Sequence, residues 1–246
     1  SWAMEVFHNA LPQSVEIRSP RAWATSLLGI DEYLRRLDGD RVVSQIRAAL
    51  VDKLLELYDS TASVDWPWFE PALSYDNAVL PHALILSGRA SGDARALDVG
   101  LRALTWLVKV QRAPAGHFRP IGCNGFYCSG GQRADFDQQP IEAWATLSAC
   151  IEAYRATEDP SWLNEVRLAF EWFLGRNDLG IELYDASTGG CHDGLHPDRV
   201  NENQGAESTL AFLLSLAELQ QLESSLAAFR RAAEAAADLP NGQVVV

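Results

Sequence analysis

The sequence predicts an all-α protein built of repeated helical hairpins, and three observations support this class. Apolar residues recur at spacings of three and four over long stretches, whereas the alternation typical of strands is scarce. Helices with a single apolar stripe alternate with helices that are apolar nearly all round. A sequence pattern also recurs about 65 residues along the chain. Stacked hairpins of this kind form a solenoid or, when the stack closes on itself, an (α/α) toroid.

Three of the predicted helices carry one apolar stripe opposite a charged face, so they should lie half exposed at the surface. They span Asp40–Ser60, Asp93–Val110 and Pro160–Leu174. Three others are apolar on nearly every side and should be buried in the middle of the protein. These span Asn77–Leu86, Ile141–Tyr154 and Ala206–Leu219.

The repeat pairs one buried helix with one exposed helix. Ala90–Asp93 opens a segment that reaches Trp106, and Ala156–Asp159 opens a similar segment 66 residues later. Each unit is then a buried helix, a short turn, an exposed helix and a long return loop. The short turns should lie at one end of the stack, and the long loops at the other. These loops fall near 60–75, 111–136 and 178–203.

Acidic residues occupy matching positions in successive repeats. Asp76, Glu142 and Glu207 each fall near the first turn of a buried helix, so we expect them on one rim. Crowded carboxylates raise one another's pKa, whereas a helix N-terminus lowers it, so such a rim can separate an acid from a base. We predict Asp137 and Glu207 as the catalytic pair, with Glu142 and Asp76 as supporting acids.

An aromatic segment precedes the first of these acids. Asp65–Glu70 (DWPWFE) places two carboxylates around three aromatic rings, and Tyr75–Asn77 follows closely. Aromatic faces stack on sugar rings, and carboxylates accept hydrogen bonds from hydroxyl groups. The alternative is a loop that tryptophan pins into the core, with Asp76 as a helix N-cap. The substrate-binding residues predicted here are Asp65, Trp66, Trp68, Glu70 and Asn77.

Two further segments, 134–142 and 201–208, place amides before a carboxylate at a helix start. A ligand with many hydroxyl groups requires such side chains, so Gln138, Gln139, Asn203 and Gln204 are predicted to bind substrate. Three alternatives stay open. Asp137 can cap a helix, Glu142 can complement the helix dipole, and Glu207 can be paired within the core.

Three more residues lie on the long loops at the predicted rim. His117, Arg119 and Asp193 are predicted to contact substrate, although a lone histidine is more often structural and Asp193 can simply hold a turn. The neighbouring Cys191 and His192 could indicate zinc. A zinc site needs about four ligands, and neither CxxC nor HExxH occurs, so we expect no metal and no cofactor.

Composition excludes several classes of partner. The chain has 246 residues, with 20 Lys and Arg against 33 Asp and Glu, and its net charge of −13 argues against nucleic acid and anionic membranes. No apolar run spans a bilayer, no signal peptide begins the sequence, and four cysteines form no disulfide framework, so a cytoplasmic protein is expected. Cys123 and Cys128 only weakly indicate a disulfide, and Cys150 is predicted to be a core thiol.

The length favours a single domain over residues 1–246. Residues 1–20 are expected to form an N-terminal extension, and residues 222–246 a C-terminal helix and tail.

Several strings resemble a known group, namely WPWFE, YDNAVLPHAL, FDQQPIEA, WFLGRNDLG and NQGAES. They resemble the helical domain associated with bacterial family-4-type glycosyltransferases, and the helix pattern resembles the six-hairpin glycosidase-like (α/α) toroids. The resemblance implies carbohydrate binding or glycoside-bond chemistry without an organic cofactor. About eight helices are expected here, against twelve in a complete toroid, so the ring is shortened or incomplete.

The sequence therefore predicts a carbohydrate-active protein that acts on a glycosidic bond of an oligosaccharide or glycan by carboxylate acid/base chemistry. The alternative is a non-catalytic glycan-binding or accessory module of a glycosyltransferase partner domain. A third class is a zinc enzyme similar to the lanthionine cyclases, which are also α/α toroids.

Overall fold

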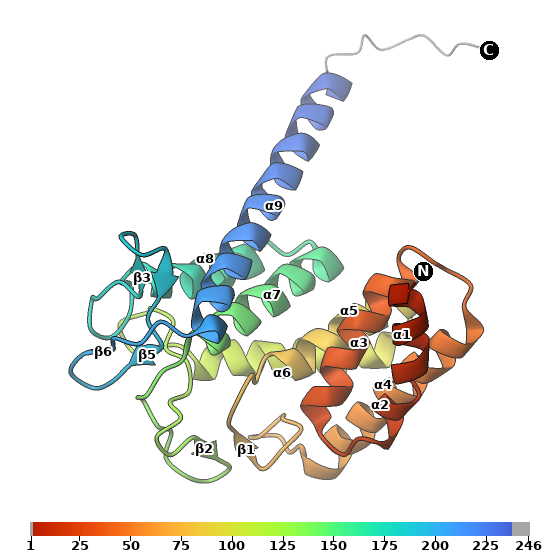
Figure 1. The fold of residues 1–246 in the computed structure, drawn as a ribbon, viewed down its shortest axis with the longest axis horizontal. Coiled ribbons are helices and arrows are strands. Elements are labelled where there is room, and N and C mark those ends of the chain that lie inside the picture. Colours follow the sequence, from red (N-terminus) through yellow and green to blue (C-terminus); the bar gives the residue numbers. More distant parts are fainter. Residues whose placement is uncertain (1, 238–246) are drawn as a thin grey trace.

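The computed structural model describes residues 2–237, and helices dominate it (Figure 1). The predicted class, all-α with an (α/α) hairpin repeat, is confirmed. Ser1 and residues 238–246, the ends of the predicted extension and tail, lie outside the described residues. The helices are α1 (Trp2–Ala10), α2 (Gln13–Glu16), α3 (Pro20–Leu34), α4 (Arg41–Thr61), α5 (Val79–Ser91), α6 (Ala94–Val110), α7 (Pro140–Thr157), α8 (Ser161–Phe173) and α9 (Ala206–Ala237).

The helices form two layers of an arc. The inner helices α3, α5, α7 and α9 lie side by side in that order, and each of α4, α6 and α8 packs outside the inner helix that precedes it. Two of the outer helices begin at the predicted residues. Asp40 and Asp93 are their N-caps, because each accepts hydrogen bonds from backbone amides in the first turn of α4 or α6. The hairpins therefore follow the predicted order of inner helix, short turn, outer helix and long loop.

The core lies between the two layers. α7 is buried along nearly its whole length, as its continuous apolar sequence predicts, and α5 is buried on most sides. Aromatic residues from the loops and the outer helices fill the space around them, and the largest fully buried side chains are Trp68, Phe69, Trp172 and Phe173.

The expectation for the third apolar helix is wrong in part. α9 buries Ala211, Phe212 and Leu222, but Leu210 and Leu213 on its opposite side are exposed. Among the described residues α9 packs mainly on α7, and less on α8, so its far side has no neighbouring helix. It also continues without a break through residue 222, where a separate C-terminal helix was expected, and projects beyond the body of the protein (Figure 1).

The long loops are ordered by three short antiparallel strand pairs. β1 (Ala72–Leu73) pairs with β2 (Tyr127–Cys128), which ties together the loops that lead into α5 and α7. Within the loop before α9, β3 (Tyr184–Asp185) pairs with β4 (Gly190–Cys191), and β5 (Gly194–Leu195) pairs with β6 (Val200–Asn201). Each strand has two residues, too short to show in a sequence pattern.

Within the described residues, no helix combines the length and the apolar character needed to cross a bilayer. All four cysteines are free thiols, so Cys123 and Cys128 form no disulfide, and Cys150 lies in the core as predicted.

Close packing of α5 against α6 depends on glycine. A Cβ atom at Gly88 would lie 2.5 Å from the backbone nitrogen of Leu97, whereas a Cβ at Gly29 in α3 would meet nothing within 4 Å. We expect Gly88→Ala to lower the free energy of unfolding by about 1–3 kcal/mol, because α5 and α6 must move apart. Gly29→Ala should leave it unchanged or raise it by up to about 1 kcal/mol. Urea denaturation of both variants checks this, and equal effects would contradict the close packing.

Candidate active site

The acids of the repeated position meet where the inner helices begin. Asn77 donates hydrogen bonds to Glu142 Oε2 from its backbone nitrogen at 3.3 Å and from Nδ2 at 3.0 Å. The hydroxyl of Tyr75 donates to Glu207 Oε2 at 2.9 Å. Residues that precede α5 thus contact the first turns of both α7 and α9. We call Asp76, Glu142 and Glu207 the acid rim.

Burial changes the protonation of two of these acids. Glu142 is only 2% exposed, and burial raises its pKa to about 7, although hydrogen bonds from Asn77 oppose the shift. Burial also raises the pKa of Asp76 to about 6, where Arg21 lowers it and Glu207 raises it. One oxygen of each carboxyl group, Asp76 Oδ1 and Glu142 Oε1, is buried without a hydrogen-bond partner among the described residues. The rim therefore holds two carboxyl groups able to exchange protons near neutral pH.

Asp76 has a strained backbone. Its φ angle of 45° lies in the left-handed region, which residues other than glycine, asparagine and aspartate seldom adopt. It is not the helix N-cap, because α5 begins after Ala78 and no side chain caps it. The alternative of a simple capping aspartate is thus wrong.

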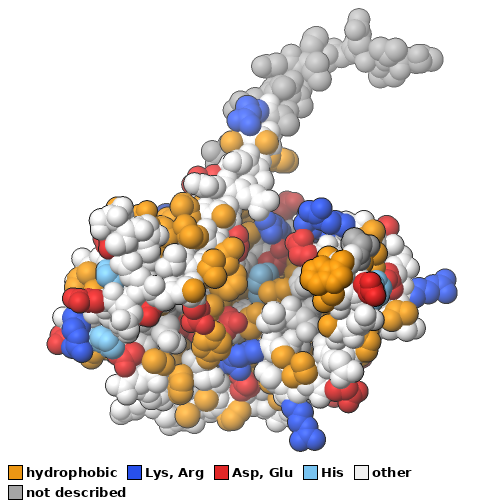
Figure 2. Space-filling model, in the orientation of Figure 1, with side chains coloured by type: hydrophobic (Ala, Val, Ile, Leu, Met, Phe, Trp, Pro, Cys, Tyr) orange, Lys and Arg blue, Asp and Glu red, His pale blue; other side chains and the backbone are white. Residues whose placement is uncertain are grey.

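The segment before Asp76 is held by α3. Arg21 donates from Nη1 to both oxygens of Glu70, at 3.0 and 2.8 Å, and from Nη2 to the Ser74 hydroxyl at 3.3 Å. Glu70, a predicted ligand of substrate, is thus engaged within the protein, whereas Asp65 is exposed. Figure 2 shows acidic side chains around the N-terminal end of α9, with basic ones beside them, in a hollow between α9 and the N-terminal helices.

The aromatic rings of the preceding segment are in the core. Trp66 is 5% exposed and Trp68 is fully buried, and both lie against Trp106. Neither indole offers a face to a ligand, so the prediction that Trp66 and Trp68 bind substrate is wrong. The alternative, in which tryptophan anchors the loop in the core, is correct for both. The exposed aromatic ring beside the acid rim is Tyr75, which was not among the predicted binding residues. Its position directly before Asp76 in the sequence is the signal that could have identified it.

Asp137 lies apart from these contacts. Its Oδ1 is 2.5 Å from Nδ1 of His196, and both side chains are partly exposed. The pair forms because the backbones of Gln138 and Leu195 make an antiparallel bridge, which brings the loop before α7 against the β5–β6 hairpin. No contact joins Asp137 to the acid rim among the described residues. His196 carried no signal in the sequence.

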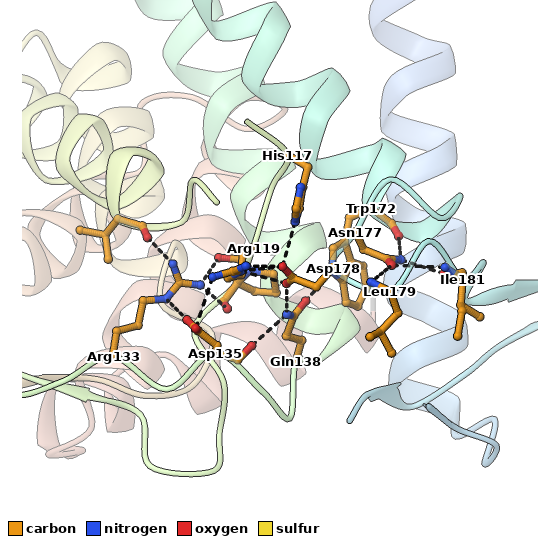
Figure 3. Close-up of polar contacts among 12 residues, drawn as sticks. His117, Arg119, Arg133, Asp135, Gln138, Trp172, Asn177, Asp178, Leu179 and Ile181 are labelled. Carbon is orange, nitrogen blue, oxygen red and sulfur yellow. Dashed lines mark hydrogen bonds and ion pairs between the residues drawn. The ribbon is translucent and has the colours of Figure 1, made fainter. Parts of the chain in front are cut away.

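Three predicted ligands of substrate belong to an internal network centred on Asp178 (Figure 3). Its carboxylate accepts hydrogen bonds from Arg119 Nε at 2.8 and 2.9 Å, from Gln138 Nε2 at 2.6 Å, and from His117 Nε2 at 3.0 Å. Burial alone would raise the pKa of Asp178, but these hydrogen bonds outweigh burial and lower it. Because Asp178 lies 40 or more residues from all three, sequence spacing could not reveal the network.

Gln138 extends this network into the core, since its Oε1 accepts a hydrogen bond from Trp172 Nε1 at 2.8 Å. Arg133 donates to the carbonyl oxygens of Arg119 and Pro120 at 2.7 and 3.0 Å. The network thus joins the loop before α7 to the loop after α8. Its members hold these loops in place.

The remaining predicted residues have these positions. Gln139 precedes α7 without capping it, and Asn203 is exposed. Gln204 donates to Asp185 Oδ2 at 3.0 Å and accepts from the Thr188 hydroxyl at 2.7 Å. Asp193 Oδ1 accepts from the backbone nitrogen of Gly205 at 2.7 Å, so it holds a turn before α9.

The Cys191–His192 pair is also internal. Burial, together with the charge of Asp193, raises the pKa of Cys191 to about 12. No group of three or more potential metal ligands occurs in the part of the chain that the structure describes.

Comparison with known proteins supports the fold. No family model matches the chain. No curated protein matches it either. Among solved structures, a GH76 α-mannanase of Bacteroides thetaiotaomicron is similar with a TM-score of 0.58 and 13% identity, over 83% of this chain and 52% of that one. The GH76A α-1,6-mannanase of a Salegentibacter species gives 0.61 and 12%, over 89% and 64%.

An unsaturated glucuronyl hydrolase specific for heparin is also similar, with a TM-score of 0.50 and 11% identity, over 66% of this chain and 47% of that one. The chain spans about half to two thirds of the length of these structures. At such low identity the likeness establishes the (α/α) toroid fold alone.

Proposed function

We propose that the chain binds an oligosaccharide at the acid rim and cleaves a glycosidic bond there. The observation that carries the proposal is the pair of carboxyl groups with raised pKa, Asp76 at about 6 and Glu142 at about 7, beside the exposed Glu207. Glycoside cleavage needs one protonated carboxyl group to donate to the leaving oxygen and a second carboxylate to act as base or nucleophile. The toroid fold of glycan-cleaving proteins adds support.

In this proposal Asp76 is the proton donor. It is only partly buried, so a glycosidic oxygen can reach it, and its raised pKa keeps it partly protonated near neutral pH. Glu207 is the exposed carboxylate that acts as base or nucleophile. Glu142 lies deeper, where it holds Asn77 by hydrogen bonds. Asp137, a member of the catalytic pair predicted from the sequence, is a second candidate because its carboxylate is partly exposed near the start of α7.

A non-catalytic glycan-binding module that serves a glycosyltransferase is the second candidate function. It is favoured by the short span of the chain against the mannanases, of which it covers 52% and 64%. In that case the rim acids only accept hydrogen bonds from sugar hydroxyls.

One experiment separates the two functions. The chain is incubated with a panel of oligosaccharides that includes α-1,6-linked mannose chains and uronic-acid-containing chains. Binding is followed by calorimetry, and products by mass spectrometry. Shortened products are expected from wild type and not from Asp76→Asn. Binding without products supports the accessory module. If the chain shows no binding and forms no products, both proposals are overturned.

A further inference from the structure

Arg21, at the start of α3, reaches across to the segment that carries Asp76. Its Nη1 contacts both carboxylate oxygens of Glu70, its Nη2 contacts the Ser74 hydroxyl, and its Nε donates to the backbone oxygen of Tyr75. The Arg21 and Glu70 side chains are only 18% and 22% exposed. One side chain therefore fixes three residues of the loop just before Asp76.

This loop needs such support because of its backbone. Asp76 adopts a left-handed conformation that costs about 1 kcal/mol or more and persists only where its surroundings enforce it. On the far side, Asn77 Oδ1 accepts from the backbone nitrogen of Ser74 at 2.8 Å, and Asn77 Nδ2 donates to Glu142. Arg21 holds the near side through the Tyr75 carbonyl group. Asp76 is thus clamped from both directions.

Titratable groups face Asp76 from three elements. The carboxylate of Glu207 acts on it from α9, Glu142 lies on α7, and Tyr75, whose pKa of about 12 keeps its phenol neutral, lies beside it in the loop. Arg21 is the cation that acts on it from α3 and lowers its pKa, against the effect of burial. Without Arg21 we expect the acid to keep its proton to higher pH.

We infer that Arg21 is a positioning residue of the acid rim, which holds the backbone before Asp76 and supplies the positive charge that offsets the neighbouring carboxylates. The inference rests on the proposed function for its catalytic meaning, but the effect on Asp76 can be measured without a substrate. No local sequence pattern indicates this role, because Arg21 lies about 50 residues before the loop that it holds and next to the predicted N-terminal extension.

The test compares Arg21→Met and Arg21→Lys with Arg112→Met. Arg112 forms an ion pair of similar burial with Glu165, and neither residue contacts the acid rim among the described residues. The Asp76 carboxyl group is titrated by ¹³C NMR in each variant. We expect its pKa to rise by about one unit in Arg21→Met, to recover largely in Arg21→Lys, and to stay at the wild-type value in Arg112→Met.

Thermal unfolding of the same variants distinguishes a specific effect of Arg21 on Asp76 from a general loss of protein stability. If Arg21→Met and Arg112→Met lower the melting temperature alike while the Asp76 titration is unchanged, Arg21 has only a structural role and the inference fails. If the titration shifts as expected but no oligosaccharide is cleaved by wild type, the inference stands and the proposed function fails. Where cleavage occurs, its basic limb, which reports deprotonation of the proton donor Asp76, should move to higher pH in Arg21→Met.

Discussion

Replacing Asp76 with asparagine is expected to lower the rate of the proposed glycoside cleavage by about 10²–10⁴-fold, the usual contribution of a general acid. An amide cannot donate the proton that a carboxyl group with a pKa of about 6 supplies. The exchange should leave the fold intact, since asparagine tolerates the left-handed backbone that Asp76 adopts. The measurement is the initial rate on the oligosaccharide that wild type cleaves, across pH 4 to 9 in steps of about half a unit.

The matched control is Asp98→Asn, which removes an exposed carboxylate on α6 that pairs with Arg102. It should retain the wild-type rate. Asp137→Asn is measured alongside, because the sequence predicts Asp137 as one of the catalytic pair. A large loss of rate in Asp137→Asn together with a wild-type rate in Asp76→Asn would identify the Asp137–His196 pair as the proton donor and contradict the role of Asp76.

Removing the Asp178 carboxylate is expected to lower the free energy of unfolding by about 3 kcal/mol, near the lower end for breaking a buried ion pair because Arg119 keeps partial contact with water. Asp178→Ala leaves Arg119 without its partner, and it removes the acceptor of the Gln138 and His117 hydrogen bonds. Chemical denaturation at neutral pH gives the change directly.

The effect of Asp178 should also depend on pH in a defined direction. Its pKa is lowered in the folded protein, so its contribution is complete above the pKa of an unfolded aspartate, about 3.9. The contribution is lost as the pH falls through the lower folded value. The difference between wild type and Asp178→Ala should therefore shrink below about pH 4. The control is Asp198→Ala, whose exposed pair with Arg199 should contribute less than about 1 kcal/mol. Equal losses in both variants would contradict the network.

The helical architecture is largely readable from the chain. Apolar stripes mark the outer helices, and the caps Asp40 and Asp93 mark where two of them begin, because both signals depend on neighbours within a few residues. α9 departs from its expected burial for a physical reason. Leucines such as Leu210 and Leu213 have the same character whether or not a helix lies against them, and only the arrangement in space decides it.

The candidate site is readable only in part. The repeat places Asp76, Glu142 and Glu207 at matching positions, and the helix starts bring them together. Tryptophan in a loop gives the same signal for a sugar platform as for an anchor, so the sequence alone could not decide between the two for Trp66 and Trp68. Arg21 and Asp178 act through partners tens of residues away, which no local pattern records.

The repeat gives the three carboxyl groups of the acid rim different exposure to water. The three successive inner helices α5, α7 and α9 have one such acid each near their starts, and the carboxyl group is half-buried at Asp76, buried at Glu142 and exposed at Glu207. One position of the repeat therefore presents the same chemical group to water to three different extents within one site.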